Sequence, residues 1–568
     1  MCGILFKVSK TPSPSFETDL SVLDHRGPDG SGYLEENRRD WIFQEGHTRL
    51  SILDLSNAAS QPMTKQRVTL LYNGEIYNYE YLRKVYNLIP RSTGDTEVLL
   101  DLYINYGFSA LTQLRGEFAY TIIDSRGKYP RVYAGRDSLG VKPLYYKHTG
   151  DELFISSEIR GIQALSPSPI SMEQFSKLIV FGYSGNKTLF SGIEKVKQGE
   201  TLEFTIEENT IRRNHFPKKS LKRVYETKKE PTLSNLKSSI ETAVERRMIA
   251  DVPVSSTLSG GVDSTIITTI ASRLNPGINT YTIGIEGVDD ELTLARDTAR
   301  RLKTHHHEVL ISMDEVFSNM ENIVSIMEEP SDKGSLVPTY FLAQAVEDKV
   351  TLVGEGADEI FGGYNRHKIY LDRYYGILNK DKKFEDYFNE NLRLFKGDKN
   401  IKWNDPDYFI ENPASVIGNR VLKYDIETEL VQFHNARLDK MFMANSIEAR
   451  TPYLDEDLVS LALSFKFASK FYPEKKPLRR AFEGEIPANV LNRPKAALKM
   501  PFDSWLERKE VLSVLKNSIL PDEVFSQEDI NKLLETKKEQ KNTPRLLWLL
   551  YLSNIWYNQN KQYGILFD

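Results

Sequence analysis

From Pro231 onward, segments that favour strands alternate with segments that favour helices. The first helix is indicated by an apolar face whose residues recur four positions apart, at Leu236, Ile240, Val244 and Met248. Strands are then predicted at 252–258, 280–285, 307–311 and 349–353, with helices at 264–274 and 292–302. This alternation predicts a parallel sheet covered by helices, an α/β fold. Such sheets bind ligands beyond the carboxyl ends of their strands, so the pattern also limits where a site can lie.

A serine- and glycine-rich segment follows the first of these strands, with the sequence Ser259, Gly260, Gly261, Val262, Asp263 and Ser264. Adjacent glycines let backbone N–H groups approach an anion, the serines add hydroxyl donors, and the next helix points its positive amino end at the same place. The segment is not a Walker A loop, because no Gly-Lys-Ser/Thr follows. Asp263 would repel a phosphate unless Mg²⁺ lay between them, so the segment predicts a nucleotide site with metal. A tight turn with a capping serine is the structural alternative.

A second glycine-rich segment, 354–364, follows the strand predicted at 349–353 and reads GEGADEIFGGY. Its acidic residues would lie at the carboxyl end of a parallel strand, where such sheets place ligands. Asp358 is the expected partner of Asp263 for Mg²⁺, and Glu355 is a candidate acid or base. A solvated acidic loop is the alternative, but such loops seldom carry Phe-Gly-Gly-Tyr.

The first two hundred residues have a different pattern. Strands are predicted at 2–8, 68–73, 118–124, 131–134 and 153–156, and helical spacing is confined to pieces such as 96–106. This predicts an α+β domain built on antiparallel sheet. We place that domain at 2–205, a linker at 206–232, and the parallel-sheet domain, with a helical C-terminal part, at 233–568. The linker is rich in lysine and arginine, and a solvated linker is a better interpretation than a binding patch for a polyanion.

The chain of 568 residues contains one cysteine, Cys2. A lone cysteine excludes intrachain disulfides and thiolate metal sites, and fits a reducing compartment, so we expect a cytoplasmic protein. We expect neither a signal peptide nor a membrane helix, and the net charge of −5 gives no electrostatic reason to expect a nucleic acid or membrane partner. If Met1 is removed, Cys2 carries a thiol and an α-amine, whose pKa of about 7.7–8.0 suits a general base.

Six motifs occur in order through the first part of the chain, at 25–29, 49–52, 73–78, 94–97, 115–119 and 135–140. Together with Cys2 they resemble the class II glutamine amidotransferase domain over about residues 2–160. The resemblance implies an N-terminal nucleophile hydrolase fold, an αββα sandwich, in which Cys2 attacks glutamine.

The same resemblance implies a role for each matched residue around Cys2. Arg49 would hold the α-carboxylate of glutamine. The side-chain amide of Asn73 and the backbone N–H of Gly74 would form the oxyanion hole. The α-ammonium group would be held by two carboxylates, Glu75 and Asp95.

The second half resembles the ATP pyrophosphatases, which activate a carboxylate as an adenylate and release pyrophosphate. GEGADEIFGGY at 354–364 and SIEARTPYLD at 446–455 narrow the resemblance to the synthetase domain of the asparagine synthetase family. Lys475 would contact pyrophosphate, with Lys476 as the competing candidate, because charge accumulates on that leaving group. The resemblance implies ATP contacts at Leu258, Ser259, Gly260, Gly261, Asp263, Ser264, Ile283, Gly354 and Lys475, with Mg²⁺ on Asp263 and Asp358.

The two resemblances together predict an ATP-dependent, glutamine-hydrolysing amide synthetase. Its small-molecule partners would be glutamine, ATP and, by resemblance, aspartate, with a homodimer left open. Ammonia would travel through the protein to an acyl-adenylate, where Glu355 would assist proton transfer.

Two departures from the family pattern leave the acceptor open. Val353 stands where a hydroxyl residue is usual, and the segment 493–498 has Ala-Leu in place of Gly-Phe. A first alternative is therefore the same reaction on a sugar uronate, a peptide or an antibiotic-precursor carboxylate. A second is a non-catalytic sensor of glutamine or nucleotide, which should have lost Cys2, Asp263 or Glu355.

Overall fold

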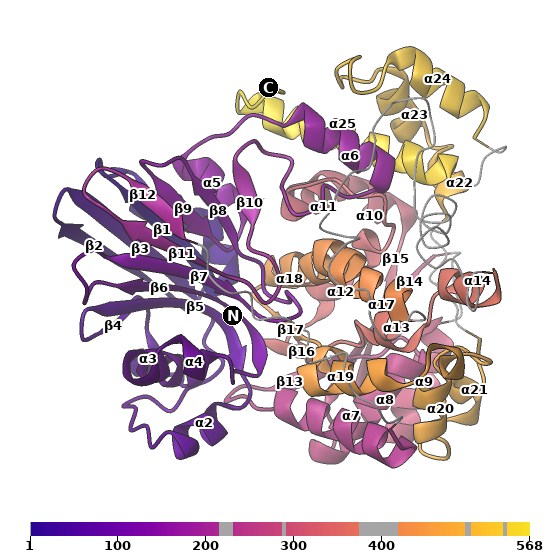
Figure 1. Ribbon diagram of the computed structural model, residues 1–568. Helices are drawn as coiled ribbons and strands as arrows, with labels where there is room; N and C mark the ends of the chain where they lie inside the picture. Colours follow the sequence, from indigo (N-terminus) through magenta and orange to yellow (C-terminus); the bar gives the residue numbers. More distant parts are fainter. Residues whose placement is uncertain (1, 215–230, 287–290, 374–418, 495–500, 538–541) are drawn as a thin grey trace.

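The computed structural model describes residues 2–214, 231–286, 291–373, 419–494, 501–537 and 542–568. Two parts lie side by side (Figure 1): a sandwich of antiparallel sheets from the first half of the chain, and a parallel sheet surrounded by helices from the second. Within the described residues, no helix has both the length and the apolar character needed to cross a membrane.

The sandwich consists of two six-stranded sheets. The first has the order β10 (Ile193–Lys195), β8 (Tyr145–His148), β9 (Leu153–Ser156), β1 (Cys2–Ser9), β3 (Trp41–Arg49), β2 (Gly30–Arg38). The second has the order β12 (Ile211–Asn214), β11 (Thr201–Ile206), β7 (Arg131–Arg136), β6 (Gly116–Asp124), β5 (Val68–Ile76), β4 (Met63–Lys65). All neighbouring strands are antiparallel, as predicted.

Side-chain alternation along the strands explains the layers of the sandwich. Ile4, Phe6 and Val8 of β1 enter the core between the sheets, whereas Leu5 faces outward onto α1 (Phe16–Leu20). The outer face of the second sheet is covered by apolar residues of α2 (Tyr79–Val85), α3 (Asp95–Tyr106) and α4 (Phe108–Leu111). Helices therefore cover both outer faces, and the predicted αββα sandwich is confirmed. The remaining helices of this half are η1 (Ser21–Arg26), η2 (Asn57–Ala59), α5 (Ile159–Leu165) and α6 (Met172–Phe181).

The hairpin β11–β12 continues the second sheet to Asn214, past position 205, where the sequence analysis ends the first domain. Alternation over four residues is too short a signal to reveal β12. Residues 215–230, most of the predicted linker, lie outside the described residues.

The second half contains a five-stranded parallel sheet of order β15 (His305–Ile311), β14 (Asn279–Ile285), β13 (Val254–Thr257), β16 (Val350–Leu352), β17 (Glu448–Arg450). Four of these strands were predicted, and β17 was not. The chain adds β14 and β15 on one side of β13, and then β16 and β17 on the other. The strand order therefore reverses between β13 and β16, and their carboxyl ends flank the crevice where such sheets bind ligands.

Helices complete this half, and two apolar clusters pack them against the sheet. One cluster joins β14 to α12 (Leu336–Ala345) and α18 (Asn435–Met443), and the other joins β13 and β16 to α7 (Leu233–Arg247) and α8 (Val262–Leu274). In the described part of this half, the other helices are α9 (Glu291–Leu302), α10 (Met313–Ser318), α11 (Met320–Met327), α13 (Ala357–Phe361), α14 (Asn365–Arg373), α17 (Arg420–Asp425), a π-helix (Ile426–His434), η6 (Pro452–Leu454), α19 (Glu456–Ser464), η7 (Phe467–Lys470), α20 (Lys476–Ala481), α21 (Ala488–Leu491), α22 (Phe502–Trp505), α23 (Lys509–Lys516), α24 (Gln527–Glu535) and α25 (Thr543–Gln562).

Buried ion pairs cross the boundary between the halves. We call three of them the interface ion pairs: Arg26 with Asp439 at 2.8 Å, Glu117 with Arg247 at 2.8 Å, and Glu75 with Arg450 at 3.1 Å. All six side chains are buried. Each pair takes one residue from each half, so the burial of either charge depends on the other half.

Candidate active site

Cys2 begins β1, where the two sheets of the sandwich approach each other. Its side chain is buried, and its backbone N–H donates to Oδ1 of Asn73 on β5 at 2.8 Å. Nδ2 of Asn73 is buried and has no hydrogen-bond partner among the described residues, so it is available to an oxyanion. Gly74 has φ +142°, and a Cβ there would lie 2.2 Å from the carbonyl oxygen of Glu117. Only glycine fits beside Asn73.

His47, which the sequence analysis did not single out, lies close to the thiol. It is buried on β3, and its Nε2 lies 3.1 Å from the carbonyl oxygen of Tyr72, so Nε2 carries a proton. Burial alone would raise the pKa of Cys2, but His47 and the amino terminus outweigh burial and lower this pKa to about 6. Cys2 is therefore mainly a thiolate at neutral pH. The sequence analysis missed His47 because a single histidine within a strand forms no motif with a recognisable spacing.

The pKa of Cys2 predicts its reactivity. Because the thiolate is the nucleophile, alkylation by iodoacetamide should rise with pH about a midpoint near 6. In His47→Gln the midpoint should move upward, because the amide can still donate to Tyr72 but carries no charge. Intact mass measures the reaction at the chain's single cysteine. His148→Gln, on β8, is the control, and an unchanged midpoint in His47→Gln would contradict this account.

Glu75 and Asp95 lie together as a buried pair of carboxylates. Asp95 Oδ2 accepts hydrogen bonds from the Tyr72 hydroxyl at 2.6 Å and the Ile76 N–H at 2.8 Å. Glu75 Oε2 accepts from Arg450 at 3.1 Å, and Oε1 has no hydrogen-bond partner among the described residues. Burial raises the pKa of both carboxyl groups, and the neighbouring carboxylate adds to the rise for Glu75. The pair is therefore suited to a second cation, such as an ammonium group.

Arg49 lies opposite Cys2 in the register of β1 and β3. Its guanidinium donates to the carbonyl oxygens of Ser56, at 2.8 Å, and Asp54. The structure thus places the predicted carboxylate-binding residue beside the thiol, held by the 54–56 loop.

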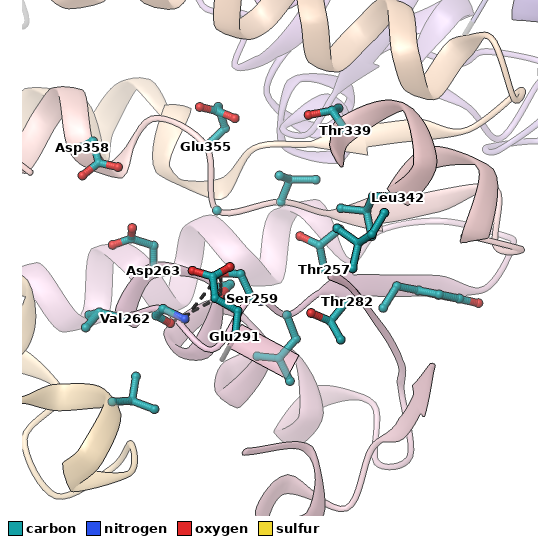
Figure 2. Close-up of a pocket in the computed structure, with 18 of the residues that line it drawn as sticks. Thr257, Ser259, Val262, Asp263, Thr282, Glu291, Thr339, Leu342, Glu355 and Asp358 are labelled. Carbon is teal, nitrogen blue, oxygen red and sulfur yellow. Dashed lines mark hydrogen bonds between the residues drawn. The ribbon is translucent and has the colours of Figure 1, made fainter. Parts of the chain in front are cut away.

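A pocket of about 400 Å³ lies at the carboxyl ends of β13, β14 and β16 (Figure 2). Ser259 follows β13, and α8 begins at Val262 with its amino end at the pocket. The two serines of the motif bind each other, because the N–H of Ser259 donates to Oγ of Ser264 at 3.1 Å. The pocket lining includes these predicted residues: Leu258, Ser259, Gly261, Asp263, Ser264, Ile283, Gly354, Glu355, Asp358 and Lys475.

Gly260 is the predicted residue that does not line this pocket. Its φ is +69°, and a Cβ there would lie 2.8 Å from Cβ of Leu294 on α9. This glycine therefore supports the loop by close packing against a helix and does not line the pocket.

Asp263 and Asp358, from the two loops, converge on one ammonium group. Nζ of Lys475 lies 2.5 Å from a carboxylate oxygen of Asp263 and 2.6 Å from one of Asp358. Burial opposes its charge, yet the two aspartates raise the pKa of Lys475 well above its ordinary value. Lys476 begins α20 and is not among the lining residues. Gly363 makes the arrangement possible, because a Cβ there would lie 1.6 Å from Oδ1 of Asp358.

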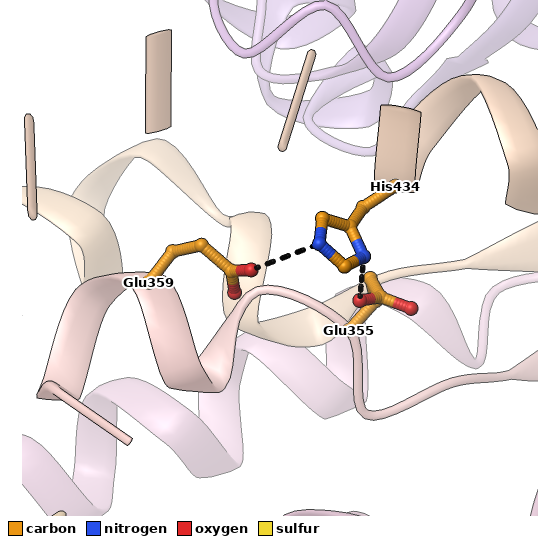
Figure 3. A group of neighbouring side chains, drawn as sticks. All are labelled: Glu355, Glu359 and His434. Atoms are coloured by element: carbon orange, nitrogen blue, oxygen red, sulfur yellow. Dashed lines mark ion pairs between the residues drawn. The ribbon is translucent and has the colours of Figure 1, made fainter. Parts of the chain in front are cut away.

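Glu355 belongs to a cluster that the sequence analysis identified only in part (Figure 3). His434 Nδ1 lies 3.1 Å from Glu355, its Nε2 lies 3.8 Å from Glu359, and Arg437 also pairs with Glu355. Burial opposes ionisation, but Arg437 and His434 lower the pKa of Glu355 to about 2. At neutral pH this carboxyl group is ionised and has no proton to donate. His434 ends the π-helix and Arg437 lies on α18.

Family models match both halves of the chain. The family model described as "Asparagine synthase" matches residues 235–558, and that described as "Glutamine amidotransferase domain" matches residues 1–216.

Curated relatives match the chain over most of its length. "Asparagine synthetase [glutamine-hydrolyzing] 1" of Bacillus subtilis is 30% identical over 99% of this chain and 97% of its own. "Asparagine synthetase [glutamine-hydrolyzing] 3" of the same organism is 28% identical, over 96% and 95%. "Asparagine synthetase [glutamine-hydrolyzing] 1" of Arabidopsis thaliana is 29% identical, over 87% and 77%. With both halves matched in order, the chain belongs to the glutamine-hydrolysing asparagine synthetase family.

Proposed function

We propose that this protein makes asparagine from aspartate, with glutamine as the nitrogen donor and ATP as the source of energy. Membership of the family makes it a glutamine-dependent, ATP-dependent ligase. The observation that carries the proposal is the presence of the two matched domains in one chain. We call residues 2–214 the glutaminase half and the described part of 231–568 the synthetase half.

The glutaminase half would release ammonia. The Cys2 thiolate attacks the carboxamide carbon of glutamine, while Glu75 and Asp95 hold the α-ammonium and Arg49 holds the α-carboxylate. The negative oxygen of the tetrahedral intermediate accepts from Asn73 Nδ2 and the Gly74 N–H. With Met1 removed, the α-ammonium group of Cys2 donates a proton to the leaving nitrogen, ammonia departs as the thioester forms, and water then hydrolyses the thioester to glutamate.

The synthetase half would activate the acceptor. A carboxylate oxygen of aspartate attacks the α-phosphorus of ATP, and pyrophosphate leaves with its charge beside Lys475. Asp263 and Asp358 supply the oxygen donors that Mg²⁺ prefers, and their convergence on one cation fits such a site. Mg²⁺ bound there would neutralise charge on the leaving pyrophosphate. Ammonia then attacks the acyl carbon, AMP leaves, and the excess proton passes to solvent, assisted by the negative charge of the ionised Glu355.

The identity of the acceptor is tested by pyrophosphate release. With ATP and ammonium chloride, aspartate should stimulate release at least about tenfold more than glucuronate, galacturonate or an acidic peptide, because a productive fit lowers the barrier by about 1.4 kcal/mol or more. Mass spectrometry of the product should show asparagine. Stimulation by another carboxylate alone would replace aspartate with that acceptor, and absence of both hydrolysis and pyrophosphate release would favour a sensor.

A further inference from the structure

Arg450 is a fully buried arginine of the synthetase half that reaches the glutamine site. It lies on β17, the edge strand, and its NH2 group lies 3.1 Å from Oε2 of Glu75. The rest of the guanidinium is held from its own half: Nε donates to Glu448 at 2.6 Å, and NH1 donates to backbone carbonyl oxygens of residues 247 and 249 at 2.9 and 2.6 Å. Together, these contacts of Nε and NH1 fix the direction in which the NH2 group of Arg450 points.

The strand that carries Arg450 is itself fixed. β17 pairs in parallel with β16, and the carbonyl oxygen of Arg450 accepts from the N–H of Val353 at 2.9 Å. Val353 lines the nucleotide pocket. Through its backbone, Arg450 contacts Val353 at the nucleotide pocket. Through its side chain, it contacts Glu75 at the glutamine site.

Among the groups around Glu75, Arg450 opposes the rise in the pKa of this carboxyl group most strongly. Asp95 and Glu448 place further negative charge near it, and Arg450 is the partner in the single ion pair that Glu75 makes among the described residues. A buried carboxylate without a cation takes up a proton. A protonated Glu75 would bind the ammonium group of glutamine poorly.

We propose that Arg450 is a positioning residue for glutamine: its 3.1 Å contact holds the Glu75 carboxyl group in place, so the synthetase half supplies part of the glutaminase site. The inference rests on the proposed role of Glu75 in binding the α-ammonium group. Arg450 itself does not touch the reacting atoms.

The test compares Arg450→Gln and Arg450→Lys with the parent enzyme in glutamine hydrolysis. Arg450→Gln should raise KM for glutamine at least about tenfold with kcat changed less than about threefold, because binding before the chemical step is weakened. Arg450→Lys should recover part of the loss. Arg246→Gln is the matched control, since Arg246 pairs with Asp455 and Asp457 at the same boundary without touching Glu75.

A pH profile separates positioning from support of the fold. Burial, Asp95 on α3 and Glu448 on β17 raise the pKa of Glu75, while Arg450 and the amino terminus lower it. Loss of Arg450 should therefore move the acid limb of kcat/KM for glutamine to higher pH. Ammonium-dependent pyrophosphate release should stay within about twofold, because it does not use glutamine.

The outcomes are distinct. An unchanged KM and an unchanged acid limb in Arg450→Gln would overturn the inference, and if that variant does not fold, the same result in Arg450→Lys would do so. In a Glu75→Gln background, Arg450→Gln should raise KM for glutamine no further. If the effects of the two substitutions on KM were fully additive, that result would also count against the inference. If the parent enzyme hydrolyses no glutamine, the proposed function fails instead.

Discussion

Replacing Cys2 with alanine is expected to lower glutamine-dependent amide formation at least about 10³-fold, because it removes the nucleophile. Ammonium-dependent formation should stay within about twofold, since the pocket between β13 and β16 does not include Cys2. Pyrophosphate release with ATP and aspartate, measured with glutamine and then with ammonium chloride, separates the two activities.

Cys2→Ser is the control for this experiment. Serine preserves the size of the side chain but lacks a thiolate at neutral pH, so it should be as inactive with glutamine as alanine. A loss of ammonium-dependent synthesis in both variants would contradict a scheme with two separate sites.

Replacing Gly363 with alanine should lower ATP-dependent pyrophosphate release at least about 100-fold. The added Cβ would lie 1.6 Å from Oδ1 of Asp358 and 2.3 Å from Cε of Lys475, so both side chains must move. Those are the groups that we propose to hold Mg²⁺ and pyrophosphate. Glutamine hydrolysis should stay within about twofold, because Cys2 and Glu75 lie in the other half.

Gly127→Ala is the control for Gly363→Ala. Gly127 is exposed, and a Cβ there would make an ordinary contact of 3.5 Å. Overpacking costs about 1–3 kcal/mol, so thermal unfolding of both variants shows whether the fold is retained. Full pyrophosphate release by a folded Gly363→Ala protein would show that the contacts of Lys475 with the aspartates are not needed.

Much of the architecture could be predicted because local pattern and tertiary structure agree. The helix predicted at 264–274 is α8 (Val262–Leu274), and the strand predicted at 280–285 is β14 (Asn279–Ile285). The loops after β13 and β16 meet because the strand order reverses between those strands, and this brings Asp263 near Asp358. The sequence pattern alone therefore pointed to the edge of the sheet where the pocket lies.

Other features depend on partners distant in the sequence and gave no local signal. β17 reads Glu-Ala-Arg, and two charges in three residues do not indicate a buried strand. It is buried because Arg450 meets Glu75 from the other half. His434 and Arg437 belong to no motif that the sequence analysis singled out, and only tertiary structure brings them to Glu355. The substitution of Ala-Leu for Gly-Phe lies outside the described residues.

The interface ion pairs restrict the amino-acid substitutions that such a chain can tolerate. Removing one partner of a buried pair leaves an uncompensated charge and costs about 3–5 kcal/mol. Because each pair spans the halves, a substitution in one half is tolerated when the other half changes with it. A chimera that joins this glutaminase half to the synthetase half of a relative 30% identical would mismatch charges wherever the pairs differ. At these six positions, each half therefore limits which residues the other half can carry.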